Sequence, residues 1–391
     1  MITTKTADNV LKSYYLDVVS DQLDKAVNPL LAQINKTTAD VLGKDVRKTV
    51  RFGVNGGIGA GTEDGNLPAA KGNRYAQFVT SLKNLYGTVE ISDKAIRSSA
   101  NSEGAFVNLL NDEMDGLVKS SSYNFGRMLF GDGTGKLCTV LALTTAAESG
   151  TASENIPADS VKNIEVGMTV DIYNVSGNFV KTSVVTSVDR TAKHFTLDNG
   201  AENVSEGCIL YMQGSKDNEI TGLGAIFNAP TLYGVNRAEN SWMKPVIKNH
   251  SSAAVSELLM QTVIDEVEEK SGSKINFIVT TWGVRRALIE NLSAYRSLEA
   301  MQLEGGFTAL SYNGIPIVAD RFCPDGTMYF LNTDDFALHQ LCDWQWLEGE
   351  DGKILKQIPG KPVYSVTLVK YAELMCYRPA GQAMVTGISE K

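Results

Sequence analysis

The sequence has no apolar run that approaches the roughly 20 residues a membrane-spanning helix requires. Its N-terminal region has no apolar signal core either, because Asp8, Lys12 and Asp17 interrupt it. These two absences predict a protein that does not span a membrane and stays in a cytoplasm.

The chain of 391 residues also lacks a basic excess, since 45 Asp and Glu outnumber 36 Lys and Arg and leave a net charge of −9. Proteins that wrap nucleic acid neutralise its phosphates with a surplus of Lys and Arg. The charge balance therefore argues against that class. With 43% hydrophobic and 21% charged residues, the composition is typical of a globular protein with room for two or three cores.

Cysteine and histidine are scarce. The five cysteines are scattered, odd in number and never spaced as Cys-x-x-Cys, so we expect reduced, buried thiols rather than disulfides or a zinc site. His194, His250 and His339 are too far apart in the sequence to form a metal triad without other ligands. No metal site is predicted.

Motifs for phosphate binding and catalysis are also missing. GGIGAGTEDG, residues 56–65, has Thr62 where a dinucleotide motif needs its third glycine. GDGTGKL, residues 131–137, lacks the first glycine of a Walker motif and follows a predicted helix instead of preceding one. Asp334 and Asp335 are expected in a turn and not as an acid–base pair. We therefore predict no enzyme, no catalytic residues and no cofactor.

Glycine is instead concentrated between Arg51 and Gly87, at positions 53, 56, 57, 59, 61, 65 and 72. Such a stretch cannot bury a core of its own, so it predicts a long two-stranded arm rather than a domain. Extended polar arms suit contact with a neighbouring subunit. The glycine-rich arm therefore favours a protein that assembles with other subunits over an enzyme.

Apolar residues at helical spacing occur on both sides of this arm. Before it, a stripe that includes Tyr15 and Leu30 predicts a helix over residues 5–42, kinked or split at Pro29. This helix packs either on its own domain or against another subunit. After the arm, an alternating strand precedes a helix of about 27 residues that is capped by Ser102 and stopped by Gly131.

From about Cys138 to Gly214 the chain becomes rich in Thr, Ser, Val and Asn. Alternating strands are predicted at residues 166–174, 181–190, 194–200 and 208–212. Short strands at this spacing predict a small barrel or sandwich. Because the segment begins directly after the long helix, it has the character of an inserted domain.

The remainder predicts an α+β region. Ser251 or Ser252 is expected to cap a helix, and a buried strand at 275–281 and a helix at 281–292 follow it. The first helix is predicted to face the core with Val255, Leu258, Leu259, Val263 and Val267. A hairpin is predicted over 312–332 and a long strand over 363–379. Trp282, Trp344 and Trp346 are expected in core packing.

The order of these elements resembles the major capsid proteins of tailed double-stranded DNA phages, which have the HK97 fold. The resemblance lies in the succession and spacing of five phrases: LYGTVEISDKAIRSS (85–99), LFGDGTG (129–135), GLGAIFN (222–228), KINFIVTTWGVRRALIENL (274–292) and NGIPIVADRFCPDGTMYFLN (313–332). It spans the chain apart from the segment rich in short strands.

The resemblance implies an α+β, HK97-type capsid fold with an inserted all-β domain. Its parts would be an N-terminal arm at 1–45, an extended E-loop at 46–92, a peripheral domain with the spine helix at 93–136, the inserted β domain at 137–217, a mainly axial domain at 218–354 and a C-terminal return to the peripheral domain at 355–391.

The implied function is that of a coat protein, which assembles through hexamers and pentamers into an icosahedral head. The head encloses double-stranded DNA without sequence-specific binding, and it would form in the bacterial host cytoplasm and remain in the virion. The sequence begins with no long, charged, helical pro-segment, so a separate scaffolding protein is the expected partner, together with a portal and decoration proteins.

Residues expected at inter-subunit contacts come from the arm and the N-terminal stripe: Arg51, Arg74, Tyr75, Lys71, Lys83, Tyr15 and Leu30. Some relatives crosslink covalently through a loop lysine, but no motif singles out Lys71 or Lys83 for that chemistry.

Two other functions remain open. An encapsulin-like compartment would share the fold. A surface protein that binds carbohydrate through residues 137–217 would use the aromatic residues of that segment, which are Tyr173, Phe179, Phe195 and Tyr211. With so few aromatics, a stabilising or decorative role for the segment is favoured.

Overall fold

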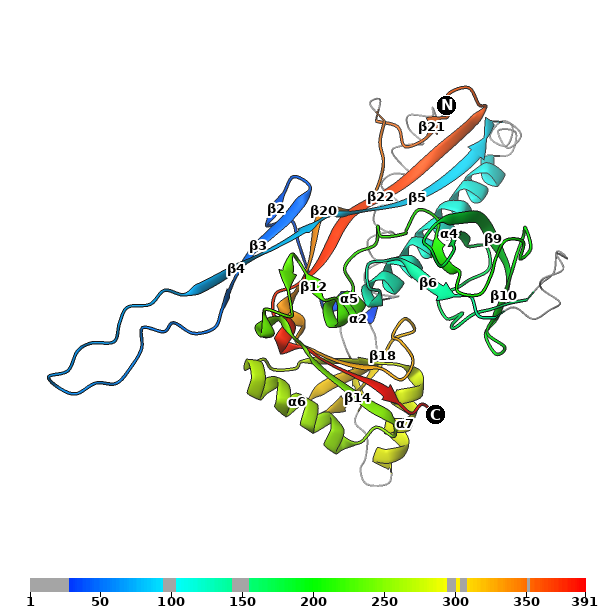
Figure 1. Ribbon diagram of the computed structural model, residues 1–391. Coiled ribbons are helices and arrows are strands. Elements are labelled where there is room, and N and C mark those ends of the chain that lie inside the picture. The colour runs from blue at the N-terminus through cyan, green and yellow to red at the C-terminus, as the bar shows by residue number, and fades with distance from the viewer. Residues whose placement is uncertain (1–27, 94–102, 143–154, 294–299, 303–307, 350–351) are drawn as a thin grey trace. The chain divides into compact units, whose positions relative to one another are not determined.

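The computed structural model describes residues 28–93, 103–142, 155–293, 300–302, 308–349 and 352–391. The chain divides into two compact units, one formed by residues 1–123 and 226–391 and the other by residues 124–225. We call them the main unit and the β unit, and each is described by itself. Figure 1 shows their elements.

One sheet of the main unit is built around a long C-terminal strand, β22 (Val363–Cys376). It pairs antiparallel with β20 (Phe336–Trp346), β5 (Lys83–Ser92) and the short β21 (Lys356–Gln357). Along β5 the side chains alternate as predicted, with Leu85 and Ile91 buried. The predicted spine helix is α4 (Glu103–Phe130), and it does end at Gly131. Trp344 and Trp346 are buried, as expected, whereas the prediction of core packing is wrong for Trp282, which is 48% exposed.

A second sheet of the main unit has seven strands and carries two helices, α6 (Glu257–Ser271) and α7 (Trp282–Ser293). Its order is β14 (Val246–Ala253), β23 (Ala383–Ile388), β19 (Met328–Leu331), β15 (Phe277–Thr280), β18 (Ile315–Ala319), β17 (Thr308–Tyr312) and β16 (Ala300–Gln302). Every residue of β15 is buried, which explains its continuous apolar run.

The pairings of this sheet correct one prediction. The expected hairpin over 312–332 is not one hairpin, because β18 and β19 lie on opposite sides of β15. The true hairpin joins β17 to β18 through Asn313 and Gly314, whose φ angles of 50° and 79° fit a tight turn. The C-terminal region contributes to both sheets, with β22 in the first and β23 in the second.

Helix α6 begins later than the sequence predicted. Ser256 is its N-cap and accepts a hydrogen bond from the Leu259 amide at 3.2 Å, whereas Ser251 and Ser252 belong to β14. Since the helix starts there, its buried face is formed by Met260, Val263 and Val267. Leu258, which was predicted to face the core, is 78% exposed.

The predicted helix over 5–42 is wrong in its described part. Only α2 (Pro29–Ala32) is helical there, and Pro29 starts that helix instead of kinking it. The chain then forms β1 (Asn35–Thr37), β2 (Val41–Leu42) and β3 (Asp45–Phe52). Tertiary pairing overrides the helical periodicity, because β1 lies parallel to β20.

A partly buried charge network links β1 to β20 and β22. The Lys36 ammonium lies 3.0 Å from the Asp343 carboxylate, which also accepts a hydrogen bond from the fully buried Lys370. Burial by itself would raise the pKa of Asp343, but the two lysines outweigh it and hold that pKa at about 2.

The β unit contains a six-stranded antiparallel sheet in the order β6 (Lys136–Thr139), β11 (Ile209–Met212), β8 (Thr169–Tyr173), β9 (Phe179–Asp189), β10 (His194–Leu197) and β7 (Ile156–Pro157). A bridge between Val140 and Ala158 joins the two edges, so the sheet closes into a small barrel. Of the two predicted architectures, the barrel is the one formed. Its place as an insertion in the fold stays a prediction.

The chain enters and leaves this barrel at one point. The Asp217 amide donates to the Thr134 carbonyl at 2.8 Å, and Arg127 and Glu219 form an ion pair whose side chains are almost fully buried. A Cβ on Gly222 would lie 2.6 Å from the Gly131 carbonyl oxygen, so only glycine fits there. The two ends of the segment are thereby fixed to each other.

Candidate interaction surface

The two-stranded arm predicted from the glycine content is present. Strand β3 pairs antiparallel with β4 (Arg74–Ser81) from Asp45↔Ser81 to Phe52↔Arg74, and residues 53–73 connect them as a long loop. We call strands β3 and β4 the arm root and residues 53–73 the arm loop. Figure 1 shows the ribbon of β3 and β4 leading into this loop.

Aromatic stacking anchors the arm root. One face of the ribbon carries Phe52 and Phe78, and both rings are stacked on Trp242, with centroids 4.5 and 6.1 Å away. Phe78 is fully buried and also packs on Tyr233. Alternation then directs Arg51 and Tyr75, which are direct cross-strand partners, to the opposite face.

Tyr233 connects this stack to the sheet below. Its hydroxyl donates to the Leu374 carbonyl at 3.1 Å and accepts from the Cys376 amide at 3.0 Å, and both groups belong to β22. Burial raises the pKa of Tyr233, so the hydroxyl keeps its proton. Tyr233 lies in the turn between β12 (Thr231–Leu232) and β13 (Val235–Asn236), and its carbonyl accepts from the Val79 amide at 3.0 Å.

The arm loop is held closed by its own glycines. A Cβ on Gly57 would lie 3.1 Å from the Lys71 amide nitrogen, and a Cβ on Gly59 would lie 3.2 Å from the Pro68 ring. Asn55 donates from its amide to the Asn73 side-chain oxygen at 3.2 Å. Glycine thus allows the two halves of the loop to approach each other more closely than other residues would.

The outside of the arm carries exposed apolar side chains. Val54 is 80% exposed, Ile58 79%, Leu67 90% and Tyr75 62%. These four large apolar side chains are left uncovered on a narrow, projecting segment, where contact with another molecule would remove them from water. The arm is therefore the strongest candidate for contact with another molecule.

The predicted contact residues divide into two groups. Arg51, Arg74 and Tyr75 lie together where the arm root ends, and all are exposed, as is Lys71 in the arm loop. Lys83 is separate, at the start of β5. Their role as contacts stays a prediction.

The two predictions from the N-terminal stripe fare differently. Leu30 is only 1% exposed and packs within its own chain, so it presents no surface in this structure. Tyr15 lies outside the described residues.

The sequence reasoning missed Trp242 and the apolar residues of the loop. Val54, Ile58 and Leu67 are isolated among polar residues and glycines, and such single apolar side chains were a detectable signal in a segment too short to bury them. Trp242 had no signal, because more than 160 residues separate it from Phe78 in the sequence.

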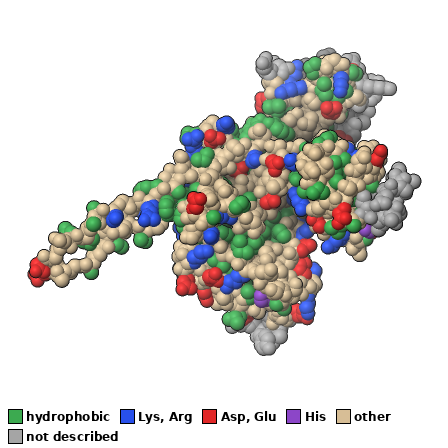
Figure 2. Space-filling view, in the orientation of Figure 1, with side chains coloured by type: hydrophobic (Ala, Val, Ile, Leu, Met, Phe, Trp, Pro, Cys, Tyr) green, Lys and Arg blue, Asp and Glu red, His purple; other side chains and the backbone are tan. Residues whose placement is uncertain are grey.

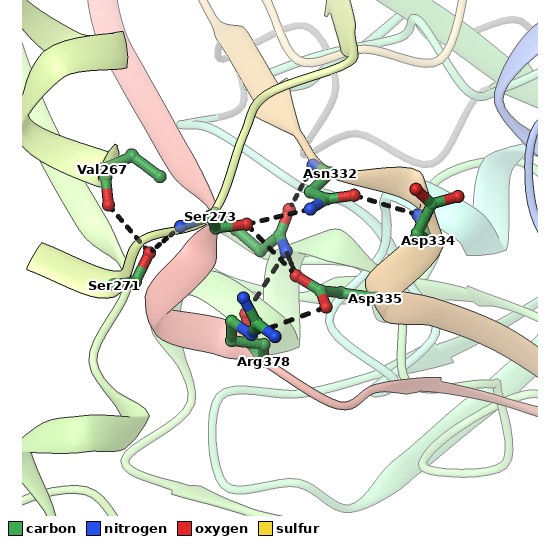
Figure 3. A network of polar contacts seen from close by, with 8 residues as sticks. Val267, Ser271, Ser273, Asn332, Asp334, Asp335 and Arg378 are labelled. Atoms are coloured by element: carbon green, nitrogen blue, oxygen red, sulfur yellow. Dashed lines mark hydrogen bonds and ion pairs between the residues drawn. The ribbon is translucent and has the colours of Figure 1, made fainter. Parts of the chain in front are cut away.

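A network of polar contacts surrounds Asp335 (Figure 3). Asp335 accepts hydrogen bonds from Ser273 at 3.4 Å and Gln382 at 3.1 Å, and its carboxylate lies 3.7 Å from Arg378. Burial raises the pKa of Asp335, although these partners oppose the shift. Asn332 donates to Ser273 at 3.0 Å, so the Ser273 hydroxyl accepts from Asn332 and donates to Asp335. The network joins η4 (Thr333–Asp335), η5 (Pro379–Gly381) and the end of α6.

Other classes of site find no support in the described part of the chain. No group of three or more His, Cys, Asp or Glu there could hold a metal ion. No described helix is long and apolar enough to cross a membrane. All five cysteines are free and four of them are buried, as predicted. Asp334 lies in the turn η4 (Thr333–Asp335), also as predicted.

His339 is fully buried between two partners. Its Nδ1 lies 3.0 Å from the Ala39 carbonyl oxygen and its Nε2 lies 2.9 Å from the Tyr377 hydroxyl. Burial lowers the pKa of His339, so the neutral ring serves as a link between β20, β22 and the segment after β1.

Three aromatic residues of the β unit, Tyr173, Phe179 and Tyr211, form a cluster. The Tyr173 ring contacts Phe179 and Tyr211 edge-on, with centroids 5.6 and 5.4 Å away, while Phe195 is buried in the barrel core. Only Phe179 of these is largely exposed, at 56%. A single exposed ring is a small platform for a sugar.

No protein-family model matches the chain, and no curated protein sequence matches it. Solved structures do. The capsid asymmetric unit of cyanophage A-1(L) is similar with a TM-score of 0.54 and 12% identity over 93% of each chain. This similarity establishes the fold, and the predicted α+β, HK97-type capsid fold is confirmed.

Two further structures are similar at lower scores. They are an encapsulin complex from Synechococcus elongatus, with a TM-score of 0.47 and 10% identity over 95% of each chain, and the capsid of Myoviridae phage XM1, with a TM-score of 0.46 and 8% identity over 93% of this chain and 92% of that one. At these scores they support no further conclusion.

Proposed function

We propose that the chain is a phage major capsid protein, a coat subunit that assembles with copies of itself into a closed shell around double-stranded DNA. The observation that carries the proposal is the fold, which is that of a cyanophage capsid subunit over 93% of the chain. The arm fits the same function, because it exposes apolar surface that a monomer leaves uncovered.

The shell follows from many weak contacts. Subunits whose contacts are heterologous close into rings, and rings of five and six copies generate a closed icosahedral lattice. Each contact needs only a few kcal/mol, because a subunit held by several neighbours dissociates only when all contacts break together. The excess of acidic residues is compatible with DNA that is enclosed without being bound tightly. The subunit acts by packing, not by catalysis.

The implied partners are a scaffolding protein, a portal and decoration proteins, with assembly in the bacterial host cytoplasm and the finished protein in the virion. In the β unit, the closed barrel with one exposed aromatic ring supports a stabilising or decorative role more than carbohydrate binding.

Sedimentation of the purified protein over a wide concentration range, with and without its scaffolding protein, tests the proposal. Ring-shaped capsomers or shells are expected. Monomers alone under all of these conditions contradict it. Electron micrographs of the particles distinguish a phage head from an encapsulin-like compartment, which would share the fold. The compartment would contain protein cargo, and the phage head would contain DNA.

A further inference from the structure

Three Asn-Gly pairs occur in the chain, at residues 55–56, 199–200 and 313–314. Asparagine is chemically labile, and a following glycine exposes its side-chain amide to attack by the next backbone nitrogen, because no Cβ stands in the way. All three asparagines are exposed, so exposure by itself does not rank them. Their hydrogen bonds differ, and these decide which pair can react.

The pair at Asn199 is held by the turn that contains it. The Gly200 amide donates to the Leu197 carbonyl at 3.2 Å, so the nitrogen that would attack is already engaged. The Lys181 ammonium donates to the Gly200 carbonyl at 2.8 Å and to the Asn199 carbonyl at 3.4 Å. Rotation of the backbone at this pair therefore requires several hydrogen bonds to break.

The pair at Asn313 forms the tight turn of the β17–β18 hairpin. Its φ angles, 50° at Asn313 and 79° at Gly314, are fixed because the strands pair on either side of the turn. The Asn313 side-chain nitrogen donates to the Gln261 side-chain oxygen at 3.0 Å, and among the described residues the Asn313 side-chain oxygen accepts no hydrogen bond. This asparagine is thus held in place without a donor that would activate its amide.

Asn55 lies in the arm loop, outside any strand, and Figure 2 shows this loop as a narrow projection. The Asn55 side-chain oxygen accepts a hydrogen bond from the Gly57 amide at 2.9 Å, and its side-chain nitrogen donates to Asn73 at 3.2 Å. The Gly56 amide donates to no group in the part of the chain that the structure describes. The attacking nitrogen is therefore unengaged, and the Gly57 amide is placed to stabilise negative charge on the oxygen under attack.

We propose that Asn55 is a site of spontaneous deamidation, at which the Gly56 nitrogen attacks the asparagine side chain and water completes its conversion to aspartate or isoaspartate. Hydroxide takes the proton from the Gly56 amide, and a bond forms between that nitrogen and Cγ of Asn55. The Cγ–Nδ2 bond breaks, and ammonia leaves. Water then adds to either carbonyl of the cyclic imide and opens the ring. Hydroxide and water are the only co-reactants.

The reaction changes the chemistry of the arm loop. Aspartate adds a negative charge there, and isoaspartate also lengthens the backbone by a methylene group. The change occurs beside the side chain of Lys71, whose Cγ lies 3.3 Å from the position that a Cβ on Gly56 would take. Since the reaction takes place within one subunit, the inference does not rest on the proposed function.

Incubation of the full chain in dilute, mildly alkaline solution, followed by mass spectrometry of its peptides, tests the proposal, because one sample reports all three pairs. Loss of the side-chain amide at Asn55 should be at least about tenfold faster than at Asn199 or Asn313. In urea the hydrogen bonds of the two turns are lost, so the three rates should become similar. The rate at Asn55 should be no lower in the folded protein than in urea, because Gly57 assists only in the folded loop.

Gly56→Ala should slow the reaction at Asn55 by at least about tenfold, because the added Cβ hinders closure of the ring. The arm should tolerate this change, since the nearest atoms belong to the flexible side chain of Lys71. Gly72→Ala is the matched control in the same loop, with nothing within 4 Å of the added Cβ, and it should leave the rate unchanged.

The wild type alone is enough to overturn the proposal. If Asn55 in the folded protein reacts no faster than Asn199 and Asn313, or more slowly than in urea, the site is wrong. Equal rates at Asn55 in Gly56→Ala and Gly72→Ala also contradict attack by the Gly56 nitrogen. None of these results depends on whether the subunit assembles, so the proposed function is tested separately.

Discussion

The ring of Phe52 stacks on the ring of Trp242 with their centroids 4.5 Å apart and their planes 8° apart. Phe52 is the last residue of β3, and Trp242 lies in η3 (Ser241–Met243), nearly 200 residues later. This contact, together with Phe78, fixes the direction in which the arm leaves the main unit's core. The arm is thus an ordered element whose base is packed, although its loop has no core.

Replacing Trp242 by alanine should loosen the arm root. The ring is partly exposed, so we expect a loss of about 1–2 kcal/mol in the free energy of unfolding, below the cost of a fully buried tryptophan. Urea unfolding measures the loss, and hydrogen exchange should rise in β3 and β4. Trp282→Ala is the control, since that ring is 48% exposed, and it should change less. Unchanged exchange in both strands would contradict the role of the stack.

Deleting residues 53–70 should leave a folded subunit that cannot form stable shells. The deletion joins Phe52 to Lys71 and leaves three residues before β4, enough for a hairpin turn around Gly72. The free energy of unfolding should change by less than about 0.5 kcal/mol, because the removed side chains are exposed. Sedimentation reports the assembly. A wild-type yield of shells from this variant would refute the assignment of the arm.

The partly buried charge network at Asp343 should make the free energy of unfolding fall in acid. Its folded pKa of about 2 lies below the usual value of 3.8, so the ionised form stabilises the fold above that range, and the contribution is lost as the pH falls from about 4 to 2. Because Asp343 is partly exposed, we expect this loss to be only about 1–2 kcal/mol. Urea unfolding from pH 6 to pH 2 measures it.

Asp343→Asn should be less stable than the wild type at pH 6, because the buried Lys370 ammonium loses the carboxylate charge to which it donates. Its stability should also vary less between pH 4 and 2. An equally steep decline in this variant would show that other carboxylates cause the wild-type decline.

Two glycine-to-alanine substitutions should have opposite effects. A Cβ on Gly222 would meet the carbonyl oxygens of Gly131 and Leu129 at 2.6 and 2.8 Å, so Gly222→Ala should destabilise the β unit by more than about 2 kcal/mol. Gly116 is exposed within α4 with nothing within 4 Å, so Gly116→Ala should stabilise by about 0.5–1 kcal/mol. Thermal unfolding compares them. Equal effects would mean that the close approach at Gly222 does not constrain the fold.

Local patterns in the sequence were enough to predict the elements whose formation depends on residues close together in the chain. The glycines between positions 53 and 72 predicted the arm, Gly131 predicted the end of α4, and alternation predicted the strands of the β unit. Each of these signals depends on neighbours in the chain, through backbone freedom or side-chain periodicity. The order of the elements then sufficed to predict the capsid fold.

The features that depend on contacts between residues far apart in the sequence were decided only by the tertiary structure. Residues 35–37 fall within the predicted helix, yet they form a strand because β20 offers an edge and Asp343 a counter-charge. The start of α6 at Ser256, the position of β18 and β19 on opposite sides of β15, and the closure of the barrel at Val140 were equally invisible. Pairing energies between strands far apart in the sequence outweigh local propensity, and a single sequence does not show which strands will meet.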